Sequence, residues 1–227
     1  VRAYIRAHRE KNTVAADLWN ALSEASGEDV EPIVRAWIEQ PGFPCVSLRR
    51  VERKGRIALE LHQTRFHARA PRGAQGPASA RWPIPWVGRV GRKETHRHLL
   101  TKARETVPLQ GSAPFLYGNA EEGGFFRPLH DAAELRRLTA SFGKLAPIER
   151  MGLVSHQWAH VRAGHAPIES LLEVVNALGN ETDPDVLGTL HAPLGFIADH
   201  IAPEAGAATL VRYREWLVDR FRKPLSE

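Results

Sequence analysis

The stretch W-I-E-Q-P-G-F-P, residues 37–44, marks the point at which the chain changes from helix to strand. Before it, apolar residues recur at spacings of three and four, which is the period of one face of a helix. Pro41 and Gly42 predict that this helix ends there, because both are poor helix formers. After Pro44, residues 45–51 follow the period of a strand. The sequence therefore predicts a boundary between a helical and a β segment at Pro44.

Two more helices are expected before this boundary. The chain opens with helical spacing, and Thr13 is a good N-cap for a second helix that Gly27 would end. Asp29 is the expected cap of the third helix. Short helices with strong apolar stripes need a partner surface, and we expect part of that surface to lie outside this chain. The stripe of the third helix consists of Val30, Ile33, Val34, Trp37 and Ile38.

A series of short strands is expected after the boundary. The first two, residues 45–51 and 57–66, would be joined across Arg53-Lys54-Gly55-Arg56, and a Pro/Gly/Ala-rich loop would cover about residues 70–80. Short strands separated by turn signals are typical of a small antiparallel β-sandwich. The remaining strand-like runs are residues 82–90, 94–102, 105–109 and 114–117.

From Asp131 to the end the pattern is helical. Asp131 and Glu134 have the spacing of a capping box, which marks the start of a helix. Stacked helices of the lengths expected here would form a solenoid-like layer. The fold class predicted from the whole sequence is a multidomain α and β protein. The later helices are expected near residues 147–163, 167–178, 184–201 and 204–222.

Composition limits the classes of function. The chain has 227 residues, of which 43% are hydrophobic, and a net charge of +5 carried mostly by scattered arginines. A nucleic-acid-binding surface would require a clustered basic face, so no nucleic-acid partner is expected. No apolar run approaches the roughly 20 residues of a membrane span, so none is expected. The single Cys45 fits a reducing compartment, and we expect a cytoplasmic location.

Several motifs, taken in order, resemble one family. Together with W-I-E-Q-P-G-F-P, they resemble the gluzincin zinc aminopeptidases (the alanyl, puromycin-sensitive and endoplasmic-reticulum enzymes). In that family the last helices of a thermolysin-like catalytic domain lead into a small β-sandwich and then into an ARM/HEAT-like helical domain. The motifs are L-E-L-H-Q-T-R-F at 59–66, W-P-I-P at 82–85, G-F-F-R at 124–127 and N-E-T at 180–182, with Arg150, Leu153, Ala159, Arg162 and Gly164 in the last helical segment.

The resemblance implies three domains. Residues 1–43 would be the last helices of the catalytic domain, 44–129 the β-sandwich, and 130–227 the N-terminal part of the helical domain. Pro128 and His130 depart from the family pattern after G-F-F-R, so we expect the strand of this motif to end early. The family's zinc motif H-E-x-x-H, its glutamate ligand and its amine-binding segment precede the matched region, and we expect longer sequence upstream to contain them.

The resemblance also implies the function. This chain would be the non-catalytic, C-terminal portion of an enzyme that removes N-terminal amino acids from peptides, acting as spacer and cover of the substrate cleft. Zinc and peptide substrates would belong to the full-length enzyme, and the upstream catalytic domain would be the partner. The alternative is an independent module that binds a peptide or protein without enzymatic activity.

Two histidines imitate the zinc-protease signature. His156 and His160 stand four apart in S-H-Q-W-A-H, residues 155–160, and therefore share a helix face. Gln157 holds the position of the general base, and an amide cannot take a proton from bound water. The family's third ligand position falls on Gly179. We therefore expect surface or interhelical histidines, and no catalytic, cofactor-binding or metal-binding residue in this chain.

The other chemically active side chains have ordinary interpretations. His96 and His98 share one strand face, and His62 is a candidate third member of this group. We expect these to be exposed histidines on the surface of the sandwich. Cys45 follows a proline at a strand start and is expected to be a small core residue rather than a nucleophile.

Overall fold

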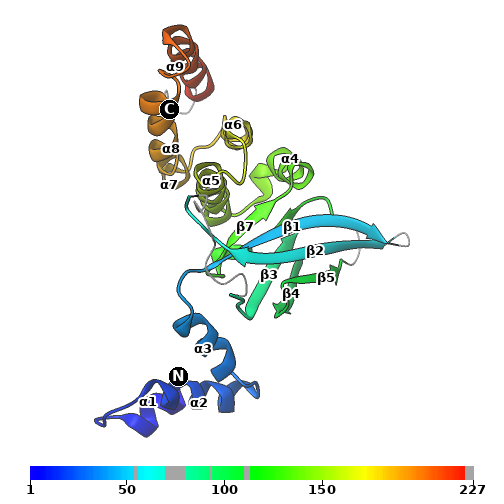
Figure 1. Ribbon diagram of the computed structural model, residues 1–227, viewed down its shortest axis with the longest axis vertical. Coiled ribbons are helices and arrows are strands. Elements are labelled where there is room, and N and C mark those ends of the chain that lie inside the picture. Colours follow the sequence, from blue (N-terminus) through cyan, green and yellow to red (C-terminus); the bar gives the residue numbers. More distant parts are fainter. Residues whose placement is uncertain (54–55, 70–79, 93, 110–112, 223–227) are drawn as a thin grey trace.

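The computed structural model describes residues 1–53, 56–69, 80–92, 94–109 and 113–222. Three helices, two β-sheets and a helical layer follow one another along the long axis of the molecule (Figure 1). The predicted turn at Lys54-Gly55 and most of the predicted loop over residues 70–80 lie outside the described residues. Among the described residues, no helix combines the length and the apolarity needed to cross a membrane.

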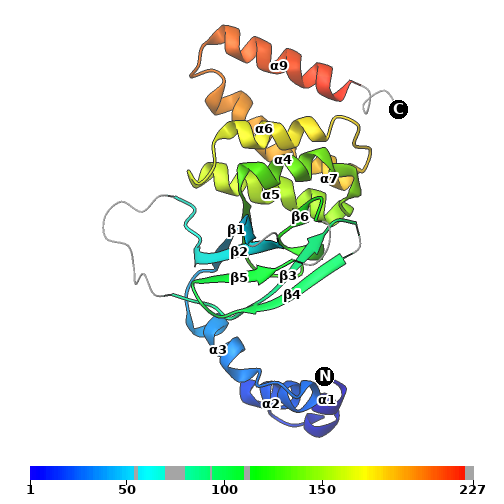
Figure 2. The same cartoon turned by 90° about the vertical axis from the view of Figure 1, so that its right-hand side faces the viewer.

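The three N-terminal helices project away from the sheets, as both views show (Figures 1 and 2). None of their residues is buried. The predicted caps Thr13 and Asp29 are each one residue too early, because the N-cap positions are Val14 and Val30. At the second helix, Asp17 accepts from the Val14 N–H at 2.9 Å. Gly27 ends that helix in the left-handed conformation, as predicted. The helices are α1 (Arg2–His8), α2 (Ala15–Ser26) and α3 (Glu31–Glu39).

The stretch that contains the predicted boundary attaches α3 to the sandwich. Trp37 Nε1 donates to the Pro83 carbonyl at 3.0 Å, and the Trp37 ring lies 6.2 Å from the Trp82 ring. Gln40 Nε2 donates to the Arg81 carbonyl at 2.8 Å. Gly42 then adopts a φ of 90°, which favours glycine, and the chain turns into the first strand at Pro44.

Two sheets form the sandwich. One has the order β5-β2-β1-β7 and the other β4-β3-β6. β1 pairs antiparallel with β2, but β7 pairs parallel with β1, so the predicted wholly antiparallel sandwich is wrong at this edge. The strands are β1 (Pro44–Arg53), β2 (Arg56–Arg65), β3 (Ile84–Val90), β4 (Glu94–Leu100), β5 (Arg104–Pro108), β6 (Leu116–Tyr117) and β7 (Arg127–His130).

The strand expected at 124–127 instead covers Arg127–His130, so it begins at the residue where it was predicted to end. Pro128 is tolerated because β7 is an edge strand and proline removes only one backbone donor. His130 is accommodated because its Nε2 accepts from the buried Gly118 N–H at 3.0 Å. Both departures from the family pattern therefore fit within the strand.

A layer of helices packs above the β1–β7 edge (Figure 2). Asp131 caps α4 by accepting from the Glu134 N–H at 2.8 Å, which confirms half of the predicted capping box. The helix expected over 184–201 is broken, because Pro193 lacks an N–H and its ring would clash with the carbonyl one turn earlier. The helices are α4 (Ala132–Ala140), α5 (Pro147–Arg162), α6 (Ile168–Ala177), α7 (Pro184–Gly188), α8 (His191–Phe196) and α9 (Ala207–Phe221), with a π-turn at Ile197–Ile201.

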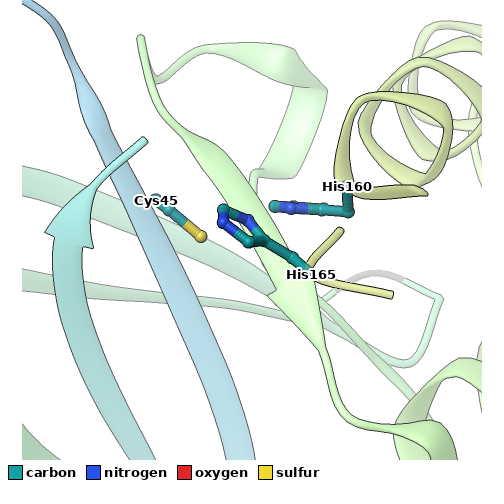
Figure 3. A group of neighbouring side chains, drawn as sticks. All are labelled: Cys45, His160 and His165. Atoms are coloured by element: carbon teal, nitrogen blue, oxygen red, sulfur yellow. The ribbon is translucent and has the colours of Figure 1, made fainter. Parts of the chain in front are cut away.

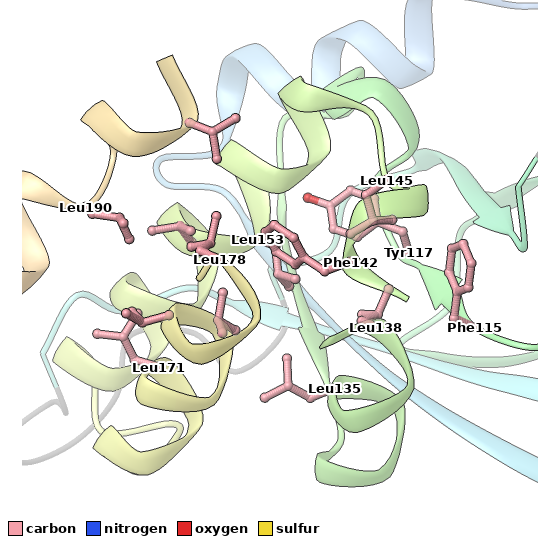
Figure 4. Packing of buried hydrophobic residues seen from close by; sticks show 14 of the residues in the cluster. Phe115, Tyr117, Leu135, Leu138, Phe142, Leu145, Leu153, Leu171, Leu178 and Leu190 are labelled. Carbon is pink, nitrogen blue, oxygen red and sulfur yellow. The ribbon is translucent and has the colours of Figure 1, made fainter. Parts of the chain in front are cut away.

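Each layer has its own apolar core. The sandwich core is centred on Leu59, Trp82 and Trp86, which are at most 1% exposed. The helical core packs Leu138, Leu153 and other side chains between α4, α5 and α6 (Figure 4). Tyr117 and Phe115 of the β6 region belong to this second core, so the sandwich and the helices share a continuous packed boundary.

Truncation of a sandwich core residue should destabilise the fold. Leu59→Ala is expected to lower the free energy of unfolding by about 2–5 kcal/mol, because Leu59 is 1% exposed and the cavity cannot fill with water. Leu99→Ala is the matched control, since Leu99 is 45% exposed, and should cost less than about 1 kcal/mol. Urea denaturation of both variants measures the difference, and equal losses would contradict the assigned core.

Candidate functional site

Several buried polar side chains lie where the helical layer meets the sandwich. We call this region the joint: Cys45–Leu48 of β1, Arg127–His130 of β7, and α5 with its flanking loops. β7 pairs with β1 in parallel register from Cys45↔Arg127 to Leu48↔His130, and α5 packs on β7. The joint therefore contains both histidines of S-H-Q-W-A-H.

His156 is buried in a hydrogen-bonded chain between Glu122 and Arg127. Its Nε2 lies 2.7 Å from Glu122 Oε2, and its Nδ1 lies 3.2 Å from Arg127 Nη1. Arginine can only donate, so Nδ1 accepts and Nε2 donates to the carboxylate. Both ring nitrogens of His156 are therefore engaged, and neither is available to a metal ion.

Glu122 reaches His156 from a strained turn. Glu121 and Glu122 have φ values of 57° and 53°, in the left-handed region that non-glycine residues rarely adopt. The contacts of both residues compensate for this cost. The Glu122 carboxylate accepts from the Tyr117 hydroxyl as well as from His156, and the Glu121 N–H donates to Glu149 Oε1 at 3.0 Å. Burial and the neighbouring Glu122 carboxylate raise the pKa of Tyr117, so its hydroxyl remains a donor.

His160 lies one helical turn further along α5 and has different partners. Its Nε2 is 3.0 Å from the Pro128 carbonyl oxygen, so Nε2 carries the proton. Its Nδ1 is buried and has no hydrogen-bond partner in the part of the chain that the structure describes. Burial lowers the pKa of His160 to about 4, so the ring is neutral at pH 7. The expectation of surface or interhelical histidines is therefore wrong, because His156 and His160 are buried against β7 and its preceding turn.

Cys45 and His165 lie beside His160, and Figure 3 shows the three side chains converging. One ligand atom from each residue lies within 4.8 Å of those of the other two. Cys45 is 3% exposed, which confirms its predicted place in the core, and burial raises the pKa of its thiol to about 12. A thiol with such a pKa is not an activated nucleophile.

Three ion pairs connect charged side chains of the two layers, two between the sandwich and the helices and one within the helical layer. Arg89 Nε lies 2.7 Å from Glu149 Oε1, where the Glu149 side chain is fully buried. Arg50 makes a two-pronged contact with Glu134, with both N–O distances at 2.9 Å. Arg50 lies in β1 and Arg89 in β3, so each sheet is fixed to a helix by a buried carboxylate. The third pair, Arg150 with Glu181, joins α5 to the segment after α6.

A cleft of about 690 Å³ opens beside the joint, between β1–β2 and the helices. Its walls mix charged and apolar side chains from both layers. His165 lies at this cleft as well as in the Cys45 cluster. The residues that line it on the sandwich side include Ser47, Arg49, Glu60, His62 and Arg104, and those on the helical side include Asp131, Gln157, Glu169 and Glu173.

The structure separates the other histidines considered from the sequence. His96 and His98 both lie on β4, where His96 pairs with Glu94 of the same strand at 2.9 Å and His98 pairs with Glu105 of β5, in the other sheet, at 2.8 Å. His62 lies on β2, in the other sheet. Neither His96 nor His98 therefore forms a site with His62 through a shared sheet face.

The arrangement does not fit the family's catalytic zinc site. That chemistry requires a metal-bound water and a carboxylate base beside it. The H-E-x-x-H motif is absent from the 227-residue sequence, and both nitrogens of His156 are engaged. No step of peptide hydrolysis is therefore assigned to residues of this chain.

Sequence reasoning missed the buried partners of these histidines. Glu122 and Arg127 stand in segments with no catalytic motif, and they reach His156 only through the tertiary contacts of α5 with the turn at 120–122 and with β7. A possible signal was Gly152, a glycine inside an otherwise helical pattern, which often marks a close approach. A Cβ at this position would overlap the Glu122 carboxylate and the Tyr117 hydroxyl.

This close approach can be tested with two glycines. Gly152→Ala should lower the free energy of unfolding by about 1–3 kcal/mol, because the added methyl group displaces the half-buried Glu122 carboxylate and the buried Tyr117 hydroxyl. Gly195→Ala adds a methyl group into open space. It should raise the free energy of unfolding by about 0.4–1 kcal/mol, because the unfolded chain loses conformational entropy. Chemical denaturation measures both values. A shift of the same sign for both variants would contradict the assigned contact.

Buried neutral histidines should also make stability depend on pH. Burial lowers the pKa of His130 to about 3, whereas an unfolded histidine titrates near 6.5. The unfolded chain then binds more protons, so stability is fully present above about pH 6.5 and falls as the pH drops toward the folded pKa. His130→Gln retains an acceptor for the Gly118 N–H and should reduce the slope by up to about 1.4 kcal/mol per pH unit. Urea denaturation between about pH 7 and pH 5 measures this slope; an unchanged slope would rule out His130 as its source.

The chain is similar to known proteins over most of its length. Residues 115–226 match the family model of the ERAP1-like C-terminal domain. The chain is 29% identical over 209 residues to Aminopeptidase M1 of Arabidopsis thaliana, a match that covers 84% of this chain and 23% of the relative. It is 25% identical over 234 residues to the Puromycin-sensitive aminopeptidase of Caenorhabditis elegans, covering 100% of this chain and 24% of the relative.

A third relative, the Probable M1 family aminopeptidase 1 of Encephalitozoon cuniculi, is 34% identical over 154 residues, which covers 68% of this chain and 17% of the relative. The chain thus spans about a fifth of the length of the curated relatives that it matches. The chain is therefore homologous to M1 family aminopeptidases over most of its length, and its residues 115–226 belong to the ERAP1-like C-terminal domain family.

Proposed function

We propose that this chain is the non-catalytic portion of a zinc-dependent M1 aminopeptidase that removes N-terminal amino acids from peptides. Its role is to space the catalytic domain from the helical domain and to cover part of the substrate cleft. The observation that carries the proposal is a match over most of this chain to about a fifth of each aminopeptidase, in a sequence without H-E-x-x-H. The catalytic zinc and its ligands belong to the full-length enzyme.

The exposed apolar faces of the first helices support this role. Val1, Ile5, Val14 and Ile38 are between 57% and 70% exposed. Apolar side chains exposed together on amphipathic helices are typical of a surface that another element covers. We assign residues 1–43 to the end of the catalytic domain, whose remaining part would cover these faces.

The helical layer supports the role of a cover. Helices α4 to α9 continue away from the sandwich in both views (Figures 1 and 2). We propose that residues 130–227 are the start of a solenoid-like domain and that residues 44–129 are the spacer. In a cytoplasmic enzyme of this kind, such a layer would limit the size of peptides that reach the zinc.

The isolated chain should not hydrolyse aminoacyl substrates. Purified chain with added zinc is expected to release no chromogenic amine from leucyl or alanyl anilide, because the described residues place no carboxylate base beside a catalytic metal-bound water. Any trace of turnover should be unaffected by replacing His156 and His160, which would identify a contaminant. Turnover that disappears with either replacement would show that this chain contains its own active site.

The supporting role can be tested in a chimera. The segment of the worm Puromycin-sensitive aminopeptidase that matches this chain would be replaced by residues 1–227. We expect a folded, zinc-loaded chimera with measurable turnover, whereas the enzyme that lacks the segment should have no measurable turnover. Ile38→Ser should destabilise the chimera by about 1–2 kcal/mol and the isolated chain by less than about 0.5 kcal/mol, because Ile38 is 66% exposed here. A soluble, zinc-loaded chimera as inactive as the deletion would contradict the proposal and favour an independent binding module.

A further inference from the structure

We propose that Cys45, His160 and His165 form a binding site for one Zn²⁺ ion that fastens the sandwich to the helical layer. The three residues come from β1, from α5 and from the loop after α5, and their ligand atoms lie within 4.8 Å of one another (Figure 3). This site is separate from the catalytic zinc of the aminopeptidases. Its existence does not depend on the function proposed above.

His160 is already arranged as a metal ligand. Its Nε2–H donates to the Pro128 carbonyl, which leaves the lone pair on Nδ1. Nδ1 is buried and has no hydrogen-bond partner among the residues that the structure describes. A buried polar atom without a partner is costly, and a metal ion would satisfy it. A backbone carbonyl that holds the second ring nitrogen is the usual outer contact of a metal-binding histidine.

The fold brings the other two residues to the His160 ring. Gly164 has a φ of 74°, the left-handed conformation that ends many helices, and turns the chain so that the His165 N–H donates to the His160 carbonyl at 2.9 Å. The two imidazole rings then lie 5.7 Å apart. Cys45 faces them from the start of β1, where it pairs with Arg127 of β7.

The spacing requires only a modest contraction. Zinc–sulfur and zinc–nitrogen bonds of about 2.3 and 2.0 Å place tetrahedral ligands roughly 3.3–3.6 Å apart. The separations here are at most 4.8 Å. His165 is exposed and follows the end of α5, so it can move toward the buried pair. It also lies at the 690 Å³ cleft, which gives the ion a path from solvent.

The ligand set selects the class of metal. A thiolate with two imidazoles favours zinc and copper over magnesium or calcium, which prefer oxygen ligands. Binding forms a zinc–sulfur bond, breaks the sulfur–hydrogen bond of Cys45 and releases that proton to solvent. Three protein ligands leave a fourth position for water.

The surrounding charges are compatible with a bound cation. Arg127 is a positive charge that acts on both Cys45 and His160, and its charge favours the thiolate form. The Glu122 carboxylate interacts with Arg127 and offsets its charge. His156 and His67 are the other titratable groups that face the cluster, and His156 is engaged with Glu122.

The test is zinc binding by the complete chain after dialysis, with a competing chromogenic chelator and three single-residue variants. We expect one equivalent of zinc in the unmodified protein. Affinity should fall more than about tenfold in Cys45→Ser and in His165→Ala. His200→Ala is the matched control, since His200 is an exposed histidine of the helical layer, and should bind as the unmodified protein does. Cobalt in place of zinc should give a thiolate charge-transfer band that Cys45→Ser lacks.

Thermal unfolding provides an independent readout. Free zinc about a hundredfold above its dissociation constant should raise the Tm by roughly 5–10 °C, and His165→Ala should abolish this shift. His165 is exposed, so this variant is expected to fold even if Cys45→Ser does not. Zinc binding and a Tm shift that are equal in the unmodified protein and in His165→Ala would overturn the proposal, as would the absence of retained zinc in the unmodified protein.

Discussion

The parallel pairing of β7 with β1 is the constraint on which the rest of the structure depends. It extends the first sheet toward the helices and places Arg127–His130 under α5. Because β7 leads directly into α4 through the Asp131 cap, the helical layer is held in one orientation on the sandwich. The buried contacts of His156 and His160 and the convergence of Cys45 with His165 all depend on this pairing.

Buried ion pairs add specificity to the same boundary. Arg50–Glu134 and Arg89–Glu149 each join a strand to a helix and are largely removed from water. The desolvation of such pairs offsets much of their attraction, so their net stabilisation is small, whereas a misplaced partner leaves a buried charge unpaired at a cost of about 3–5 kcal/mol. They therefore penalise alternative packings of helices on sandwich. A rigid boundary of this kind suits a chain proposed to hold other domains in place.

The sequence predicted the order of elements well and their tertiary contacts poorly. The helix-to-strand change at Pro44 and the Asp131 cap depend on local patterns, and both are present. The predicted extent of this strand was wrong because β7 lies at the edge of its sheet, where Pro128 is tolerated. The local sequence does not reveal that edge position. The spacing in S-H-Q-W-A-H predicted that the two histidines share a helix face. It did not predict that this face is buried, because β7 and the Glu122 turn come from other segments. Cys45 and His165 could not be connected to His160 by spacing, since three separate elements supply them.

Native-state hydrogen exchange at the joint tests the central claim, that sandwich and helices form one unit through β1 and β7. Amides of Arg127, Leu129 and His130 and of Cys45–Leu48 should exchange with the same opening free energy, close to that of global unfolding, because the two strands pair with each other. Amides of α1 and α2, which bury no residues, should exchange much faster. If the β7 amides exchange as fast as those of α1 while β1 stays protected, the helical layer is not fixed to the sandwich and the account is contradicted.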